Sequence, residues 1–251
     1  VTPNPEHLVI AQKDKEFLQI LNNADISIPD GIGLAAAKKF LSLPTTKNSQ
    51  LKPFLYFAQG LGVGFSVLFD RKWLTSDFKV IRGRELFVEL IKLANKKGWR
   101  VFLLGGERNE AENAALELKK SYKSIILKTN SGPMLNSEGK PLSKVDINIH
   151  KDVVRDINKF KPHLLFVGIS APKQEKWIVT NLNKLDIGGA MVVGGTFRYV
   201  SGQVKMPPNW LAEVGLEWLW RLFTGSQSLD RVYKATIDFP LQVLIEKWRK
   251  L

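Results

Sequence analysis

Short apolar runs alternate with longer stretches of helical periodicity along most of the chain. The runs suit strands, and the run at residues 164–167 has no polar break, as expected of a strand that is buried on both faces. They lie at residues 100–104, 125–128, 164–167 and 190–193. Because helical stretches separate them, the pattern predicts an α/β fold with a mostly parallel sheet and helices on both of its faces.

The chain is predicted to begin with a long helix. Asn4 can cap this helix and Pro5 suits its first position, so we expect it to cover residues 7–22. A short strand is expected at residues 26–28. Farther along, the polar residues 130–147 predict a surface hairpin or loop, followed by a helix over residues 150–160.

Residues 51–74 are strongly apolar and aromatic, and they end in the cluster Arg71-Lys72-Trp73. One interpretation is an interfacial membrane element, in which the tryptophan and the cations lie among lipid headgroups. The alternative is a buried pair of helices. Three glycines interrupt the uncharged part, residues 53–69, which is shorter than the roughly 18 apolar residues of a spanning helix.

The character of the chain changes after residue 206. Apolar and aromatic side chains predict a helix over residues 210–223 that is apolar on most sides, and cations are interspersed through the tail. Such a helix suits docking on a membrane over a charged substrate, and it suits packing against the sheet equally well.

Composition and charge narrow the function. The 251 residues are 44% hydrophobic and include no cysteine, which excludes disulfide, thiolate and cysteine–zinc chemistry. The three histidines are widely spread, which argues against a histidine metal site. A formal net charge of +13 favours a polyanionic partner, namely nucleic acid, an anionic membrane surface or phosphorylated substrates. No nucleic-acid-binding signature is present, so no nucleic acid is expected.

The sequence starts with Val1-Thr2-Pro3, without an initiating Met or a charged n-region. We expect it to begin inside a longer open reading frame and to carry no signal peptide.

Polar residues follow the apolar run at residues 164–167. Gly168 ends that run, and Ala171-Pro172 is expected to open a helix. Polar side chains and free backbone N–H groups would then lie at the carboxyl edge of the sheet, where open α/β sheets bind ligands. The alternative is an ordinary strand-to-helix turn. The first helical turn would carry Lys173, Gln174 and Glu175.

Two other turns carry candidate chemistry. Gly105-Gly106 follows the first run and offers a backbone-amide cradle for phosphate, and Gly194-Gly195 ends the last run. Asp30 follows the predicted strand at residues 26–28, between Pro29 and Gly31, where a carboxylate can accept a proton from a bound hydroxyl. The alternative is a Pro-Asp-Gly turn whose Asp bonds only local backbone.

Seven motifs occur in order over nearly the whole chain. They are Thr2-Pro3-Asn4-Pro5-Glu6, Ala24-Asp25 with Pro29-Asp30-Gly31-Ile32-Gly33, Gly83-x-Glu85-Leu86, Phe102-Leu103-Leu104-Gly105-Gly106, Val167-Gly168-x-x-Ala171-Pro172-Lys173-Gln174-Glu175, Val193-Gly194-Gly195-Thr196-Phe197 and Gly215-Leu216-Glu217-Trp218-Leu219-Trp220-Arg221-Leu222. In their order and spacing the chain resembles the WecG/TagA/CpsF family of bacterial glycosyltransferases.

The resemblance implies a Rossmann-like catalytic domain at residues 1–205, with insertions at about 45–78 and 130–147, and a helical C-terminal appendage at 206–251 that binds membrane and acceptor. It implies an inverting transfer of an N-acetylhexosamine, typically N-acetylmannosamine, from a UDP-sugar to a polyprenyl-diphosphate-linked N-acetylglucosamine. The product would enter a cell-surface polysaccharide or teichoic acid. No metal or other cofactor would be needed. The enzyme would be cytoplasmic and peripheral on the inner face of the bacterial plasma membrane. It could also form a homo-oligomer.

The same resemblance assigns roles to residues. Asp30 matches the proposed general base, and Thr2, Asn4 and Gln174 match other polar positions of the active site. Arg221 and Arg231 are expected to pair with the lipid diphosphate. One cleft would hold Asp30 and Gln174 on opposite walls. The substrate-binding residues are expected to be Thr2, Asn4, Arg82, Gly105, Gly106, Gly168, Lys173, Gln174, Glu175, Gly194 and Gly195.

The chain departs from the family pattern at several positions. Val80 stands where the family has Arg, so that Arg82 or Arg84 would have to substitute, and Arg198 stands where it has Asp. Met206 replaces another Arg. Besides an active transferase, two alternatives therefore stay open: a diverged, inactive sugar-nucleotide or lipid-binding module, and a basic nucleic-acid-binding protein.

Overall fold

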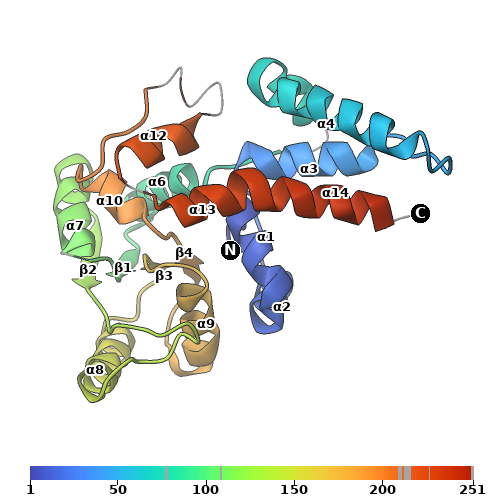
Figure 1. Cartoon of the computed structure of the whole chain (residues 1–251). Coiled ribbons are helices and arrows are strands. Elements are labelled where there is room, and N and C mark those ends of the chain that lie inside the picture. Colours follow the sequence, from blue (N-terminus) through green and yellow to red (C-terminus); the bar gives the residue numbers. More distant parts are fainter. Residues whose placement is uncertain (77–78, 108, 209–210, 212–215, 226, 250–251) are drawn as a thin grey trace. The chain divides into compact units, whose positions relative to one another are not determined.

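The computed structural model describes residues 1–251 except 77–78, 108, 209–210, 212–215, 226 and 250–251. Its contacts group into two compact units, which we call the sheet unit and the helical unit. Figure 1 labels most of their helices and strands. The sheet unit comprises Val1–Thr2, Lys15–Ser27 and Gly83–Lys205, and the helical unit comprises Pro3–Asp14, Ile28–Arg82 and Met206–Leu251. The division into residues 1–205 and 206–251 stays a prediction.

The sheet unit is built on four strands, and every strand pairing is parallel. Their order in the sheet is β2-β1-β3-β4, which confirms the predicted α/β class. The strands are β1 (Arg100–Leu104), β2 (Ile126–Asn130), β3 (Leu164–Val167) and β4 (Ala190–Val192).

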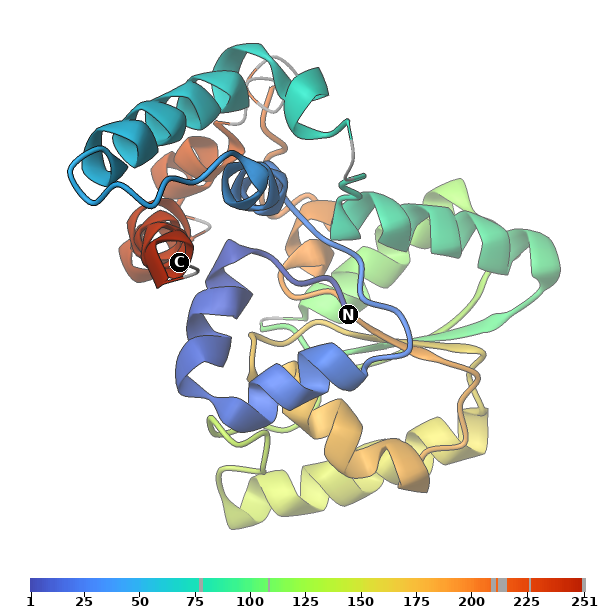
Figure 2. The ribbon, with the colours of Figure 1, turned by 90° about the vertical axis from the view of Figure 1, so that its right-hand side faces the viewer.

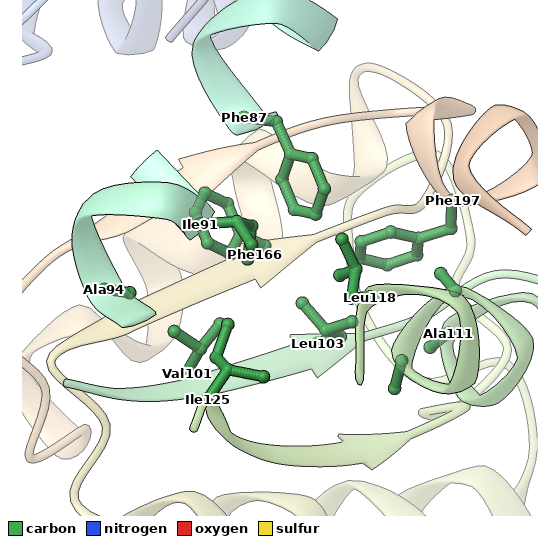
Figure 3. Close-up of a cluster of buried hydrophobic side chains, with 12 residues drawn as sticks. Phe87, Ile91, Ala94, Val101, Leu103, Ala111, Leu118, Ile125, Phe166 and Phe197 are labelled. Atoms are coloured by element: carbon green, nitrogen blue, oxygen red, sulfur yellow. The ribbon is translucent and has the colours of Figure 1, made fainter. Parts of the chain in front are cut away.

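Alternate residues of each strand pack into different layers, because successive side chains point to opposite faces. Val101, Leu103 and Phe166 pack with Phe87 of α6 and Phe197 of α10 (Figure 3). Their neighbours along the strands, such as Phe102 and Leu165, pack with α8 and α9 on the other face. Figure 2 shows helices on both sides of the sheet. The helices of this unit are α2 (Lys15–Asn23), α6 (Gly83–Lys97), α7 (Glu110–Ser121), α8 (Lys144–Phe160), α9 (Lys173–Asn181), η1 (Leu182–Lys184) and α10 (Thr196–Val200).

The helical unit has a smaller core, centred on α3. Phe40 of α3 is buried with Tyr56 and Val63 of α4, and Val243 of α14 packs against them. A second cluster joins α1 to this group through Val9. The helices are α1 (Pro5–Lys13), α3 (Ile32–Ser42), α4 (Lys52–Phe69), α5 (Arg71–Leu74), α12 (Glu217–Phe223), α13 (Leu229–Tyr233), the π-helical turn η2 (Lys234–Asp238) and α14 (Phe239–Arg249). Within the described part of the chain, no helix is long and apolar enough to cross a membrane.

Two predictions near the N-terminus are wrong. The single helix expected over residues 7–22 is two helices, because Asp14 adopts an extended conformation that ends α1. Asn4 nevertheless caps α1 as expected, and its side chain accepts a hydrogen bond from the His7 N–H. Residues 26–28 form no strand, and the Ile26 side chain is 67% exposed instead of buried.

Two further segments differ from the expectation. α8 begins at Lys144, inside the predicted loop over residues 130–147, because Ser143 caps it by accepting the Asp146 N–H. The loop folds back onto α9, where a Cβ on Gly139 would lie 2.8 Å from the backbone nitrogen of Trp177. In the C-terminal region, α12 covers only Glu217–Phe223 of the helix expected at 210–223. Trp210 and Val214 of that expected helix lie outside the described residues.

Candidate active site

The strand order reverses between β1 and β3. The chain leaves β1 toward β2 on one side and later returns to β3 on the other side of β1. In open α/β sheets, ligands bind in the crevice beyond the carboxyl ends of the strands at such a reversal. Gly105 directly follows β1 and Gly168 directly follows β3. The structure therefore places two of the predicted glycine turns at the reversal point.

These glycines allow chain segments to approach closely. A Cβ on Gly105 would lie 2.7 Å from Ile169 Cγ1 and 3.2 Å from the Gly168 carbonyl, and a Cβ on Gly168 would lie 2.4 Å from the Phe197 ring. Gly105 and Gly106 also have φ angles of +99° and +90°, which favour glycine. A side chain at Gly105 or Gly168 would thus displace its neighbours.

Gln174 connects α9 to the turn that follows β4. The Gly194 N–H donates to Gln174 Oε1 at 3.2 Å, and Gln174 Nε2 donates to Glu175 Oε1 at 3.0 Å. Both side chains are almost fully buried, with 2% and 1% exposed. Since buried polar groups with such partners are held in one orientation, Gln174 and Glu175 form a fixed polar wall beside the glycine turns. Lys173 precedes them and is half-buried.

Arg198 adds a positive charge at the same edge. Its Nε lies 3.6 Å from Glu110 Oε1, and its Nη2 lies 3.0 Å from where a Cβ on Gly195 would be. Glu110 in turn approaches Gly106, where an added Cβ would lie 2.6 Å from the Glu110 Cβ. In the sequence, Arg198 is recognisable only as a departure from the family pattern. Its pairing with Glu110, which lies 88 positions earlier in the chain, is visible only in the fold.

In the helical unit, the Pro29-Asp30-Gly31 bend lies against the N-terminal stretch. The Asp30 N–H donates to the Pro3 carbonyl at 2.8 Å, and the Ile81 N–H donates to the Pro29 carbonyl at 3.2 Å. These bonds bring the backbone beside Asn4 and Arg82 to the bend that carries Asp30. The Asp30 side chain is half-buried, and Gly31 has a φ of +95°. Three predicted site residues therefore come from segments that meet here.

The two arginines assigned to the lipid diphosphate have carboxylate partners. Arg231 Nε donates to both carboxylate oxygens of Glu6 at 2.8 Å, and Arg221 Nη2 pairs with Glu217 at 2.7 Å. Burial, with a smaller contribution from Arg231, lowers the pKa of the neighbouring His7 to about 4. His7 is therefore neutral at pH 7. An anionic ligand at Arg231 would have to share this guanidinium with Glu6.

The predicted site residues thus form two groups. One group lies in the sheet unit around the strand reversal, and Thr2, which is buried, also belongs to that unit. The other group, in the helical unit, comprises Asn4, Asp30, Arg82, Arg221 and Arg231. The cleft with Asp30 and Gln174 on opposite walls stays a prediction. No cluster of three or more His, Asp or Glu side chains among the described residues could hold a metal ion, and metal independence also stays a prediction.

The matching family model decides the class of protein. The model, described as the glycosyl transferase WecG/TagA/CpsF family, matches residues 1–54 and 61–251. The chain belongs to this family. It is a glycosyltransferase. The unmatched residues 55–60 lie in α4 of the helical unit.

Relatives from Staphylococcus aureus carry a more detailed name. Proteins from strains NCTC 8325 / PS 47, COL and MSSA476 are each named N-acetylglucosaminyldiphosphoundecaprenol N-acetyl-beta-D-mannosaminyltransferase. Each is 27% identical to this chain over 237 residues, which are 94% of this chain and 76% of the relative. The WecG/TagA/CpsF match thus extends over the two units described above.

Proposed function

We propose that this glycosyltransferase moves N-acetylmannosamine from a UDP-sugar to a polyprenyl-diphosphate-linked N-acetylglucosamine, in the synthesis of a cell-surface polysaccharide or teichoic acid. The names of the Staphylococcus aureus relatives support the sugar and the acceptor. The UDP donor is part of the proposal. The enzyme would work at the inner face of the plasma membrane as a peripheral protein, because its acceptor is anchored there.

The strand reversal in the sheet unit is the observation that carries the proposal. Gly105 and Gly168 let the turns after β1 and β3 pack closely at this sheet edge, where open α/β sheets bind ligands. Their own N–H groups donate to the Asn130 and Leu104 carbonyls, so neighbouring groups must supply the donors for a diphosphate. Arg198 provides a guanidinium beside Gly195 that can pair with phosphate oxygens. We therefore assign the UDP diphosphate to this edge and the fixed Gln174–Glu175 wall to the positioning of the donor.

Asp30 is assigned as the general base. Its carboxylate accepts the proton of the acceptor hydroxyl while that oxygen forms a bond to the anomeric carbon of the donor sugar. The bond from the anomeric carbon to the diphosphate oxygen breaks, and UDP leaves with the electron pair. Attack in line with the breaking bond inverts the configuration at the anomeric carbon.

A transfer assay with Asp30→Asn tests the proposal. We expect wild-type protein to release UDP from UDP-N-acetylmannosamine only with a lipid-diphosphate acceptor analogue. Asp30→Asn should bind UDP normally but lose about 100-fold or more in turnover, since a positioned base contributes that much. Asp152→Asn is the matched control, because the Asp152 side chain is 58% exposed on α8. Full turnover by Asp30→Asn would remove Asp30 as the base.

The same assay separates the alternatives. UDP binding without transfer from any UDP-sugar would favour the diverged, inactive module. Absence of UDP binding, together with a salt-dependent shift of duplex or single-stranded nucleic acid, would favour a nucleic-acid-binding protein. A panel of UDP-sugars in the same transfer assay identifies the donor sugar.

A further inference from the structure

α4 has two apolar faces, of which only one is covered in the structure. Tyr56 and Val63 point into the core of the helical unit and are 1% and 6% exposed. The opposite face carries large side chains that are 41% to 76% exposed, which are Phe54, Phe57, Leu61, Phe65, Leu68 and Phe69. At 3.6 residues per turn, these six positions fall within about 120° of the helix circumference.

A row of this kind on a helix surface indicates a binding partner. Water-exposed apolar side chains are common singly, but contiguous patches mark interaction sites. Residues 53–69 contain no charged side chain at all. α14, in the same unit, separately exposes Leu241 and Ile245, by 51% and 49%.

The charges around this apolar face identify the chemistry of the partner. Residues 31–76 contain six lysines and arginines but only one acid, Asp70. Lys52 begins α4, and Arg71 and Lys72 follow its end. The Asp70 carboxylate accepts the Trp73 N–H as the cap of α5, and the Lys39 ammonium lies 4.8 Å from the Trp73 ring centre. Cations and a tryptophan at the two ends of a helix with an aromatic face match the headgroups and acyl chains of an anionic bilayer.

We propose that the exposed face of α4 inserts into the interfacial layer of an anionic membrane, with the helix axis along the membrane surface. A spanning orientation is excluded, because Tyr56 and Val63 stay packed in the protein core. The inference rests on the proposed function in one respect: a lipid-borne acceptor gives the enzyme a reason to bind a bilayer.

Flotation on vesicles with Phe57→Ser and Phe65→Ser combined tests the proposal. Wild-type protein should float with phosphatidylglycerol-containing vesicles, less with phosphatidylcholine alone, and less at high salt. Removing two exposed phenyl rings should lower the partition coefficient by about tenfold or more, because interfacial binding scales with buried apolar area. The matched control combines Leu116→Ser and Val145→Ser, which remove side chains that are 60% and 68% exposed in the sheet unit. Equal flotation of the two double variants would overturn the proposal.

Site-specific labelling gives a readout that does not depend on folding of a multiple variant. The chain has no cysteine, so Gly62→Cys introduces a single thiol on α4 at an exposed position with no atom within 4 Å of the new Cβ. An environment-sensitive fluorophore there should shift to the blue with anionic vesicles and be quenched by spin-labelled lipids. The same label at Leu116→Cys should show neither effect. Absence of both effects at position 62 would contradict membrane insertion of α4.

Two further measurements separate this inference from its competitors. If the double phenylalanine variant has a smaller oligomeric state without lipid but floats normally, the face is an interface between copies of the chain and the proposal is wrong. Transfer to a short, water-soluble acceptor tests the proposed function alone. We expect the double variant to keep that activity and to lose activity with undecaprenyl acceptor in vesicles. Failure of wild-type protein with both acceptors, with flotation intact, would reject the function and leave the membrane contact standing.

Discussion

The two units hold themselves together in different ways. The sheet unit has clusters of twelve and eight buried apolar residues on the two faces of its sheet. Among the residues that the structure describes, the clusters of the helical unit comprise four and three such residues. Both units also join distant segments through buried or half-buried charged groups. Examples are the Arg231–Glu6 pair in the helical unit and Lys176 with Glu16 and Glu138 in the sheet unit.

Lys247 of α14 is the clearest example. Its side chain is 1% exposed, and its ammonium donates to the carbonyls of Phe40 and Leu43 and to Gln59 Oε1 at 2.6 to 3.1 Å. The ammonium also lies 4.4 Å from the Phe40 ring centre. One lysine thus satisfies carbonyl groups at the C-terminal end of α3 and fixes α14 to α3 and α4. The comparison teaches that the helical unit, with its smaller apolar clusters, relies relatively more on charge and hydrogen bonding than the sheet unit does.

Gly168→Val should reduce stability the most, because it introduces a steric clash in the core of the sheet unit. The new Cβ would lie 2.4 Å from the buried Phe197 ring, and neither group has room to move. We expect a loss of about 4 kcal/mol in the free energy of unfolding, together with loss of UDP binding. Urea unfolding and UDP titration measure both. Gly189→Val is the control, since a Cβ at Gly189 meets no atom within 4 Å, and an equal loss there would refute the steric explanation.

Lys247→Met tests whether charge holds the helical unit together. Methionine keeps most of the apolar stem but leaves buried carbonyls without their donor, which should cost about 3 kcal/mol. Thermal unfolding of the full chain should show this loss. Arg249→Met, which removes an exposed cation from the same helix, should change stability little. A stable Lys247→Met variant would mean that the apolar cluster around Phe40 suffices.

His7 should make the helical unit sensitive to acid. Its pKa is about 4 in the folded protein and about 6.5 in the unfolded chain, so the unfolded chain binds the proton first as the pH falls. The stability contributed by neutral His7 is complete above pH 6.5 and disappears as the pH falls toward 4, for a total of about 3 kcal/mol. Unfolding free energies measured between pH 7 and 4 should decline less in His7→Gln. Parallel declines in both proteins would show that other groups cause the acid sensitivity.

The smallest effect is expected for exposed charges on the sheet unit. Arg155 and Asp152 of α8 form an ion pair at 2.8 Å, but their side chains are 74% and 58% exposed. Arg155→Ala should therefore change the unfolding free energy by no more than about 0.5 kcal/mol. A larger loss in urea unfolding would show that the sheet unit also relies on charge and would weaken the comparison.

Much of the sheet unit could be predicted from the sequence. Strands buried on both faces need continuous apolar residues, so the runs at β1 and β3 were recognisable without any tertiary information. Glycine after each run likewise marked the sheet edge, because close approach and positive φ angles select this residue. The alternation of strands with helices was enough to predict the parallel sheet that the structure confirms.

The helical unit was less predictable, because helical periodicity is local. The pattern over residues 7–22 did not reveal that α1 and α2 separate at Asp14 and join different units. It also did not show which apolar face of α4 is covered, since Tyr56 and Phe57 are adjacent in sequence but buried and exposed, respectively. The sequence by itself determined the class of fold, the glycine edges and the family resemblance. Only the tertiary structure decided which charges pair and which apolar faces stay open, because both depend on residues that meet across more than 80 positions of chain, as Arg198 and Glu110 do.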